Sequence, residues 1–483
     1  VMAISSPSFA QNTSEQDQSV EEVVVSGVRQ NLENAQDIKR NANTFVDAIS
    51  AEDIGSLPDR SVLEAMQRMP GVSIERFQAP DDPDHFGVEG SGAVIRGMSA
   101  TRSEFNGRDS FTANSGRGLN FQDVPPELMG GVDLYKNQSA DMIEGGIGGT
   151  VNLRTAKPFD YDGFQGAVGG QLGTNTNADE TNPRFVSMIS NTWGNFGALA
   201  SVAYSQKNSQ EAGYNTIRWR QVASNNIGAG VDAETAAKVR AGQVWFARGN
   251  RYSVWNNDQE RLGLTAALQY RPSNDLKFGL DFMHGKLENE LDEHHISTGG
   301  SSSTALGRLE EIKTFDNNGD IEAVYARFSN VVTRTENRSD YNESIFQQLT
   351  FNTDWQITDN LGVKFQLGTS TSDYNQPRLD KVNLTRSGGI TTDFTQDRFY
   401  GVNTYDFDPT ALAGWTVKDL YFREDYIATD FDNAKADFDY AFDNGSILTF
   451  GANYKKFKNS GNMREDGGYA ENKATPLNNG INT

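Results

Sequence analysis

Hydrophobic and polar positions alternate in two different ways along this 483-residue chain. In the first part, residues 59–69 have the period of an amphipathic helix, with one apolar face made of Val62, Leu63, Met66 and Met69. Pro70-Gly71 ends that helix. Short runs rich in β-branched residues predict strands at 44–49, 72–74, 93–98, 132–135 and 150–154. Residues 28–157 are therefore expected to form a compact α+β domain with long loops.

After Phe159 the period changes to two. Apolar residues then occupy one face of each segment and polar or small residues the other, as in 260–270, 276–282, 361–369 and 446–455. This pattern is typical of strands with lipid outside and a polar lumen inside, although a water-soluble sandwich gives the same alternation. We count roughly nine strands, starting near residues 163, 184, 197, 260, 276, 344, 361, 426 and 446.

The connections between these strands favour a membrane barrel. Tight connections at 193–197, 271–276, 357–361 and 442–446 alternate with long polar ones at 208–257, 287–342 and 374–424. Outer-membrane barrels have short periplasmic turns and long external loops in that order. The aromatic residues expected at an interfacial girdle stand beside the tight turns: Trp193, Tyr270, Trp355 and Tyr440. Because such barrels have an even number of strands, the odd count predicts a chain that stops partway round.

Composition narrows the alternatives. With 43 Lys+Arg against 65 Asp+Glu, the net charge of −22 argues against nucleic-acid binding, which needs a basic surface. The chain has 0 Cys, which excludes disulfides, thiolate metal sites and a cysteine nucleophile. Mean hydropathy is −0.60, and no stretch approaches the roughly 20 apolar residues of a spanning helix. A membrane crossing would therefore require a closed β-barrel.

The N-terminal residues predict export and a tether. Residues 1–10 have the small residues Ser8 and Ala10 of a signal-peptidase site and are expected to be a signal-peptide remnant. Residues 11–27 are expected to be a flexible arm. Within the arm, a short extended segment could pair with another protein by strand addition, or be an ordinary edge strand: Glu21, Glu22, Val23, Val24, Val25 and Ser26.

Taken in order over residues 21–160, these segments resemble a TonB-dependent outer-membrane receptor. Glu22 to Gly27 resembles the TonB box, and residues 49–72 are similar to the first half of the family's plug domain. Two later stretches are similar to the plug's Arg-Gly strand and its most recognisable motif: Ile95-Arg96-Gly97-Met98, and residues 132–136 with 144–153. Residues 106–108, 117–121 and 154–161 further resemble a subgroup found in relatives of Xanthomonas and Caulobacter, often associated with oligosaccharide uptake.

The resemblance implies an α+β plug domain, residues 28–157, inside a transmembrane antiparallel β-barrel, residues 158–483, with roughly nine of about 22 strands present. It implies a bacterial outer-membrane location, and active import driven by TonB with its inner-membrane ExbB/ExbD motor. Further implied partners are outer-membrane lipid, the barrel-assembly machinery and a small-molecule or oligosaccharide ligand. No enzyme activity or cofactor is expected.

Candidate ligand-binding residues come from two loops. Arg102, Arg108 and Arg117 lie in the expected plug-apex loop, where they could touch ligand or bond to the barrel wall. Four rings in one expected external loop could stack on sugars, or pack within the loop itself: Trp219, Trp245, Tyr252 and Trp255.

Metal and phosphate sites have weaker signals. His85, His294 and His295 could ligate metal or haem, but solvated loop histidines are the better interpretation, and only His85 is kept as a ligand-binding candidate. Gly145 to Gly149 is better explained by tight packing than by a phosphate cradle. Residues 316–320 are better explained by a turn than by a calcium loop.

Three functions follow in order of preference. The first is active import of a carbohydrate-like ligand. The second is a ferric siderophore or haem receptor of the same architecture, which would call for external loops rich in Arg and Lys. The acids in residues 287–342 favour a neutral ligand. The third is a passive porin or adhesin, which needs neither plug nor TonB box.

Overall fold

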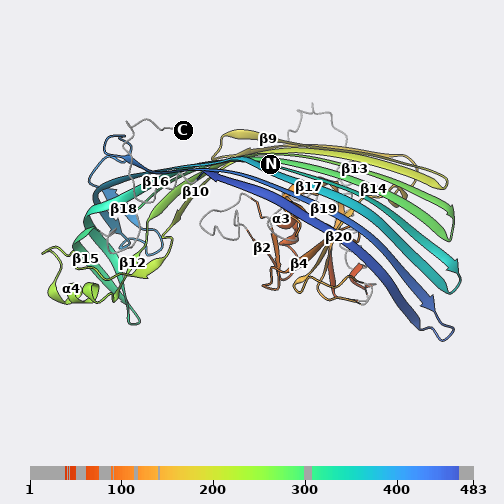
Figure 1. The fold of residues 1–483 in the computed structure, drawn as a ribbon, viewed down its shortest axis with the longest axis horizontal. Helices are drawn as coiled ribbons and strands as arrows, with labels where there is room; N and C mark the ends of the chain where they lie inside the picture. Colours follow the sequence, from red (N-terminus) through yellow and green to blue (C-terminus); the bar gives the residue numbers. More distant parts are fainter. Residues whose placement is uncertain are drawn as a thin grey trace, which may run out of the picture.

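The structure, a computed structural model, describes residues 38–40, 42, 44–50, 61–75, 89–90, 92–113, 118–139, 142–298 and 307–466. It contains a small five-stranded sheet, a two-stranded sheet and a large curved sheet. The small sheets lie on the concave side of the large one, which continues into a separate group of short elements at its far end (Figure 1). The expected signal remnant and TonB box fall outside the described residues.

The five-stranded sheet is the centre of the plug-like part. Its strand order is β1 (Val46–Ser50), β6 (Met129–Tyr135), β7 (Gly149–Thr155), β4 (Thr101–Phe105) and β5 (Arg108–Asp109). β4 runs parallel to β7, and the other neighbours are antiparallel. β2 (Val72–Glu75) pairs with β3 (Gly92–Ile95) beside it. Three short 3-10 helices follow: η1 (Phe121–Asp123), η2 (Pro126–Leu128) and η3 (Pro158–Asp160).

One described α-helix packs in this part of the molecule. α3 (Val62–Met66) begins after Ser61, whose Oγ accepts a hydrogen bond from the Glu64 amide at 3.2 Å. The apolar face predicted from the sequence is fully buried in the core, with Val62, Leu63 and Met66 at 0% exposure. Within the described residues, no helix has the length and apolar character needed to cross a membrane.

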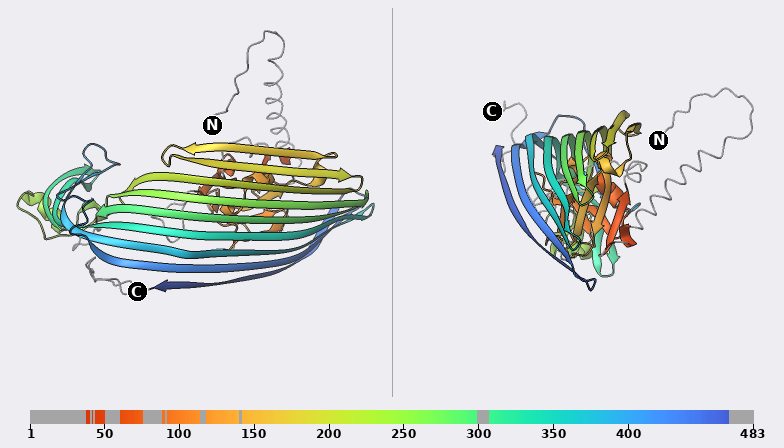
Figure 2. Two further views of the ribbon diagram at one scale, coloured as in Figure 1. Left: turned by 90° about the horizontal axis from the view of Figure 1, so that it is seen from above. Right: turned by 90° about the vertical axis from the view of Figure 1, so that its right-hand side faces the viewer.

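The large sheet has nine main strands in chain order, each antiparallel to its neighbours. They are β8 (Gln165–Asn175), β9 (Glu180–Trp193), β10 (Phe196–Asn215), β13 (Arg251–Ser273), β14 (Leu276–Thr298), β16 (Asp320–Thr358), β17 (Leu361–Asp393), β19 (Thr416–Ala441) and β20 (Ile447–Asp466). Among the described residues β8 and β20 form the two edges, so the sheet is open (Figure 2). The predicted count of about nine strands is confirmed.

Side chains on the two faces of the large sheet follow the predicted alternation. Along β13, Arg261, Thr265 and Gln269 are buried on the concave face, whereas Leu264 and Leu268 point outward and are exposed. The aromatic residues beside the tight turns are also exposed: Trp193 56%, Tyr270 47%, Trp355 47% and Tyr440 38%. An exposed apolar face next to a polar concave face suits a barrel wall in lipid. The fold class is thus a plug domain within an open, barrel-type sheet.

The long polar connections predicted from the sequence are wrong in extent. The strands continue well into them, so the connections shrink to 216–250, 299–319 and 394–415. Outside the lipid a strand needs no apolar face, and its polar residues resembled a loop.

These connections form a folded group that we call the outer lobe. It contains β11 (Trp219–Gln221), α4 (Ala233–Arg240), β12 (Val244–Ala247), β15 (Arg308–Asn317) and β18 (Val402–Tyr405). The lobe has an apolar core, separate from that of the plug, to which β16 also contributes; it includes Val239, Val244, Phe246, Leu309 and Phe328 of β16. We call the end of the large sheet that carries the tight turns the turn end. The outer lobe lies at the opposite end (Figure 1).

Candidate functional site

The contact between the plug and the wall depends on glycines in the wall. Gly263 of β13 and Gly285 of β14 are direct cross-strand partners. A Cβ added at Gly263 would lie 2.3 Å from Pro125 Cγ, and one at Gly285 would lie 2.6 Å from the Asp123 carbonyl oxygen. The absence of both side chains therefore lets the plug segment containing η1 and η2 seat directly against the wall.

Arg108 fixes the plug to the far side of the same wall. It follows the Asn106-Gly107 turn of the β4–β5 hairpin and is 0% exposed. Its Nε donates to Asn433 Oδ1 at 2.5 Å and its NH2 group to the Phe431 carbonyl at 2.8 Å, both on β19. Burial lowers the pKa of Arg108 to about 10, and Asp109 and Asp432 oppose that shift. Arg108 therefore stays charged at neutral pH, so it bonds the wall as a buried cation.

Neighbouring contacts extend this attachment along the hairpin. Ser110 Oγ lies 2.7 Å from Gln348 Oε1 on β16, and the Ala113 amide donates to Ser372 Oγ of β17 at 2.8 Å. The Phe105 ring stacks on Phe346 with 5.9 Å between centroids. One plug hairpin is thus bonded to the wall on β16, β17 and β19.

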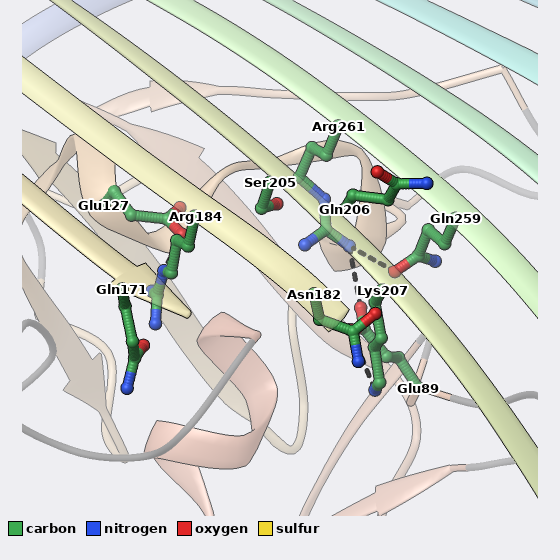
Figure 3. A pocket seen from close by; sticks show the side chains of 10 residues that line it. All are labelled: Glu89, Glu127, Gln171, Asn182, Arg184, Ser205, Gln206, Lys207, Gln259 and Arg261. Atoms are coloured by element: carbon green, nitrogen blue, oxygen red, sulfur yellow. Dashed lines mark hydrogen bonds and ion pairs between the residues drawn. The ribbon is translucent and has the colours of Figure 1, made fainter. Parts of the chain in front are cut away.

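A buried ion cluster joins the other end of the plug contact to β10 and β13. Glu89 is 1% exposed, and its carboxylate lies 2.7 Å from Arg261 NH2 and 3.2 Å from Lys207 Nζ (Figure 3). Burial is the largest single influence and raises the pKa of Glu89, but Arg261 and Lys207 together outweigh it, so the net pKa lies below its usual value. Glu89 is therefore an anion held between two wall cations.

A second ion pair borders the same cluster. Glu127 of the plug pairs with Arg184 of β9, and both side chains line a polar cavity of about 20 Å³ (Figure 3). Such a volume has room for about one water molecule. The cavity is therefore part of the interface between plug and wall, and it is too small for a transported ligand.

Asp123 is a buried carboxyl at the centre of this interface. It is 1% exposed and faces Ser344 of β16, Thr112 and Arg261. Burial raises the pKa of Asp123 to about 7, and its polar neighbours reduce the shift without cancelling it. Near neutral pH this plug carboxyl therefore exchanges between the neutral and the charged form.

The predicted plug arginines have different places. Arg108 bonds to the wall, as one of the two sequence-based alternatives proposed. Arg102 stays within the plug: it pairs with Glu104 at 2.5 Å and with Asp109, and donates to the Ile143 carbonyl at 2.7 Å. Arg117 and His85 lie outside the described residues.

The predicted aromatic residues of the external loop mostly pack within the structure. Trp255 is 7% exposed and meets His295 edge-on at 5.8 Å, and the Trp219 ring contacts Phe394 at 5.2 Å. Trp245 Nε1 donates to Asp320 Oδ1 at 3.1 Å, and Tyr252 donates to the Gly401 carbonyl at 2.6 Å. Each ring therefore makes contacts within the outer lobe or between the lobe and the adjoining wall strands.

The structure also places the glycine-rich segment 145–149, the 316–320 segment and two of the histidines. A Cβ at Gly146 would meet the Gly149 carbonyl at 2.7 Å, which supports tight packing. The Gly319 amide donates to Asp316 Oδ1 at 2.7 Å in the β15–β16 turn, which supports a turn. His294 and His295 lie on β14 instead of in a loop, because that strand runs to Thr298. Within the described residues, no group of His, Cys, Asp and Glu could hold a metal ion.

Sequence reasoning missed several interface residues. The expected plug-apex loop contains the β4–β5 hairpin, and the Asn106-Gly107 pair at its turn is a hairpin signal that could have revealed it. Glu89 stands in a polar stretch, and Asp123 lies between Phe121 and Val124 in a segment with no periodic pattern, so the sequence offered no signal for their burial. The sequence analysis also did not single out two exposed rings in the third connection, after β17. Phe399 is 83% exposed and Tyr400 is 64% exposed.

Taken together, the geometry defines a class: a barrel-type membrane protein whose concave face holds an α+β plug through buried charges. Residues 38–150 match the family model for the TonB-dependent Receptor Plug Domain. This part of the chain is therefore similar to the plug domain of TonB-dependent receptors, and the protein is located in the bacterial outer membrane. No curated protein sequence matches this chain.

Solved structures with a similar arrangement include three receptors. The siderophore receptor PiuA from Acinetobacter baumannii is 13% identical, with a TM-score of 0.32, and the match covers 87% of this chain and 62% of that one. The ferric-catecholate import receptor Fiu from E. coli K12 is 11% identical, with a TM-score of 0.41, and the match covers 88% of this chain and 63% of that one. The hemophore receptor HasR from Serratia marcescens is 11% identical, with a TM-score of 0.30, and the match covers 89% of this chain and 61% of that one. The chain thus spans less than two thirds of each of these proteins. Likenesses at this level say nothing about the ligand.

Proposed function

We propose that this protein imports a ligand across the outer membrane by TonB-dependent active transport, without chemical change to the ligand. The observation that carries the proposal is a family-matched plug fixed to the wall by buried charges at Glu89 and Arg108. Separating such charges from their partners is costly, so moving the plug requires an external energy source. A passive porin or adhesin would not need this arrangement.

The energy is proposed to enter through the N-terminal arm. Residues 21–26, Glu-Glu-Val-Val-Val-Ser, would pair with TonB by strand addition, driven by the ExbB/ExbD motor in the inner membrane. The proposed division is a signal remnant at 1–10, the arm at 11–27, the plug at 28–157 and the wall from 158 onward. The tight turns would then face the periplasm and the outer lobe the exterior.

For the ligand we propose an uncharged oligosaccharide or a related carbohydrate. An anionic ferric siderophore needs cations that are not already neutralised. In the lobe, Arg398 pairs with Glu322, Arg327 lies 3.4 Å from Glu311, and Arg308 lies 3.4 Å from Glu310. The exposed rings of Phe399 and Tyr400 offer faces on which sugars can stack. A siderophore or haem receptor is the alternative.

Binding measurements on the purified protein test this ligand class. Titration calorimetry with maltoheptaose and xylohexaose is compared with titration of ferric enterobactin and haemin. Saturable binding of a neutral oligosaccharide, weakened by Phe399→Ala and Tyr400→Ala, is the expected result. Binding of the iron compounds alone would overturn the carbohydrate proposal and leave import itself standing. Equal uptake in cells with and without TonB would overturn active transport.

A further inference from the structure

A second cavity, of about 470 Å³, lies at the turn end of the wall, and we call it the turn-end cavity. Its lining comes from three neighbouring hairpins, β13–β14, β16–β17 and β19–β20, close to their tight turns. This is the end of the large sheet on the right of Figure 1, away from the outer lobe. Small-molecule sites typically measure about 300–1,000 Å³, a range that includes this cavity.

The turn-end cavity lies on the concave face of the wall, which also holds the plug. Lys277 of the lining and Asp281 are four residues apart on β14, so strand alternation places both on one face. Asp281 faces inward, because it pairs with Lys157 at the end of the plug at 2.5 Å. Arg271 Cζ, on the other side of the cavity, lies 5.0 Å from the centre of the Phe159 ring. The cavity therefore faces the lumen and not the lipid.

The plug does not cover the turn-end cavity. Every described residue of its lining belongs to the wall, and none belongs to the plug. A ligand can therefore enter it from the turn end while the plug stays attached through Arg108 and Glu89. This distinguishes the cavity from the small one between Glu127 and Arg184, which the plug helps to form.

The charged side chains of the lining balance one another. Three are cations and three are carboxylates: Arg271, Lys277, Lys364, Asp275, Asp354 and Asp439. Lys277 Nζ lies 3.0 Å from Asp354 Oδ2. Within the described part of the chain, Arg271, Asp275 and Lys364 enter no ion pair, so their polar atoms are available to a ligand. The lining thus offers charged donors and acceptors without a net charge, which suits a neutral polar ligand better than an ion.

Side-chain amides add neutral donors and acceptors to the lining: Asn274, Gln356 and Asn360. Gln356 Nε2 donates to the Thr358 carbonyl at 2.8 Å, which fixes the amide. A Cβ on Gly362 would lie 3.2 Å from Gln356 Oε1, and its next contact in another residue would be the Asp439 carbonyl oxygen at 4.0 Å. The missing side chain at Gly362 therefore leaves space in the cavity beside an amide oxygen.

A sugar presents several hydroxyls that each donate and accept hydrogen bonds, and carboxylates, amides and amino groups supply partners of both kinds. We propose that the turn-end cavity binds a short neutral oligosaccharide, as a second ligand site on the turn-end side of the plug. The site holds sugar that has passed the plug before it diffuses into the periplasm. This role rests on the import proposed above, whereas the binding itself can be measured without import.

A fluorescent label beside the cavity tests the binding, because the chain has 0 Cys of its own. Asp359→Cys carries an environment-sensitive dye in the β16–β17 turn, next to Asn360 of the lining. The purified, labelled protein in detergent is titrated with maltotriose, xylotriose and the anionic trisaccharide trigalacturonate. We expect a saturable change with a neutral trisaccharide and weaker binding of trigalacturonate. No saturable change with either neutral sugar, or tighter binding of trigalacturonate, would overturn the proposal.

Variants of the lining locate the bound sugar. Gly362→Leu fills the cavity and should abolish the saturable change. Gly279→Leu is the matched control on the same face of β14, outside the cavity, where a Cβ would meet nothing closer than Asn352 Cβ at 3.9 Å. It should bind like wild type. Lys364→Met, at an exposed position, removes one charged donor and should weaken binding about tenfold. Wild-type affinity in Gly362→Leu or in Lys364→Met would overturn the proposal.

Uptake by cells separates this site from the proposed function. If uptake of the oligosaccharide depends on TonB but the dye reports no binding, the site fails and import stands. If the dye reports binding that Gly362→Leu abolishes, but uptake is equal with and without TonB, the site stands and active import fails.

Discussion

Arg108 of the plug occupies the space that a side chain at Gly368 of the wall would fill. A Cβ on Gly368 would lie 2.1 Å from Arg108 Nε and 2.6 Å from its Cδ. The guanidinium then reaches past β17 to bond the Phe431 carbonyl and Asn433 on β19, and it lies 4.9 Å from the centre of the Phe431 ring. The attachment of the plug at this point, here called the seat of the plug, therefore depends both on the missing side chain at Gly368 and on the hydrogen bonds of Arg108.

Replacing Gly368 should weaken the seat of the plug. Gly368→Ala forces Arg108 away from its two acceptors, and overpacking of this kind costs about 1–3 kcal/mol. We expect the plug to unfold at a lower temperature in detergent, as measured by scanning calorimetry. Gly279→Ala in β14 is the matched control, since its Cβ would meet nothing closer than Asn352 Cβ at 3.9 Å. Equal melting of the two variants would contradict the proposed seat.

The pKa of Asp123 predicts that plug stability depends on pH. Burial raises this pKa from 3.8 to about 7, so the folded plug binds the proton more tightly than the unfolded chain. Its stabilising effect is therefore complete below about pH 4 and is lost as the pH rises through about 7. A shift of this size corresponds to about 4 kcal/mol as an upper figure.

Asp123→Asn should remove that pH dependence. The variant should melt close to wild type at pH 4 and at a higher temperature than wild type at pH 8, because an amide does not ionise at the buried position. Calorimetry from pH 4 to pH 8 measures the difference. Asp443→Asn, in an exposed hairpin turn, should follow wild type throughout. A wild-type plug whose melting is flat over this range would refute the argument.

Removing the charge of Glu89 should strongly destabilise the attachment of the plug to the wall, and removing a partner charge should restore part of that stability. Glu89→Gln leaves Arg261 and Lys207 without their buried anion, which should destabilise the attachment of the plug by about 3–5 kcal/mol. Glu234→Gln, which breaks an exposed ion pair with Lys238, should cost less than about 1 kcal/mol. Calorimetry in detergent compares the two losses.

A double variant separates the ion pair from simple packing. Glu89→Gln with Arg261→Met removes both charges, and much of the lost stability should return. If the losses of the two single variants simply add, the two residues are not coupled, and the buried cluster does not hold the plug.

The sequence predicted the architecture well because lipid and core packing impose strict patterns. Alternation at 260–270 and 276–282 predicted strands β13 and β14. The predicted apolar face Val62, Leu63, Met66 and Met69 is buried, although α3 is shorter than expected and ends at Met66. The same reasoning failed where no such constraint acts. β16 extends back to Asp320, far before its predicted start near residue 344, because a strand in water needs no apolar face.

The contacts of the candidate site were harder to predict than its fold. Arg108 could be placed only as a choice between ligand and wall, because the deciding partners, Phe431 and Asn433, are more than 300 residues away in sequence. Trp255 resembled an exposed ligand-binding ring, yet it is buried beside His295. Such long-range pairings depend on strand register, which local pattern does not determine.

The outer lobe, together with the ends of β16 and β17 that pair with it, is predicted to unfold separately from the rest of the wall, because its apolar core is distinct from that of the plug. Phe246 is 3% exposed and packs 6.1 Å from the Phe328 ring, so Phe246→Ala should cost the lobe about 3–5 kcal/mol. Brief proteolysis of intact cells should then cleave residues 216–250 in the variant before wild type. Phe399→Ala, whose ring is 83% exposed in the same lobe, should leave the cleavage rate unchanged. Loss of the whole barrel from the membrane would contradict a separately folded lobe, since the wall strands do not depend on Phe246 for pairing.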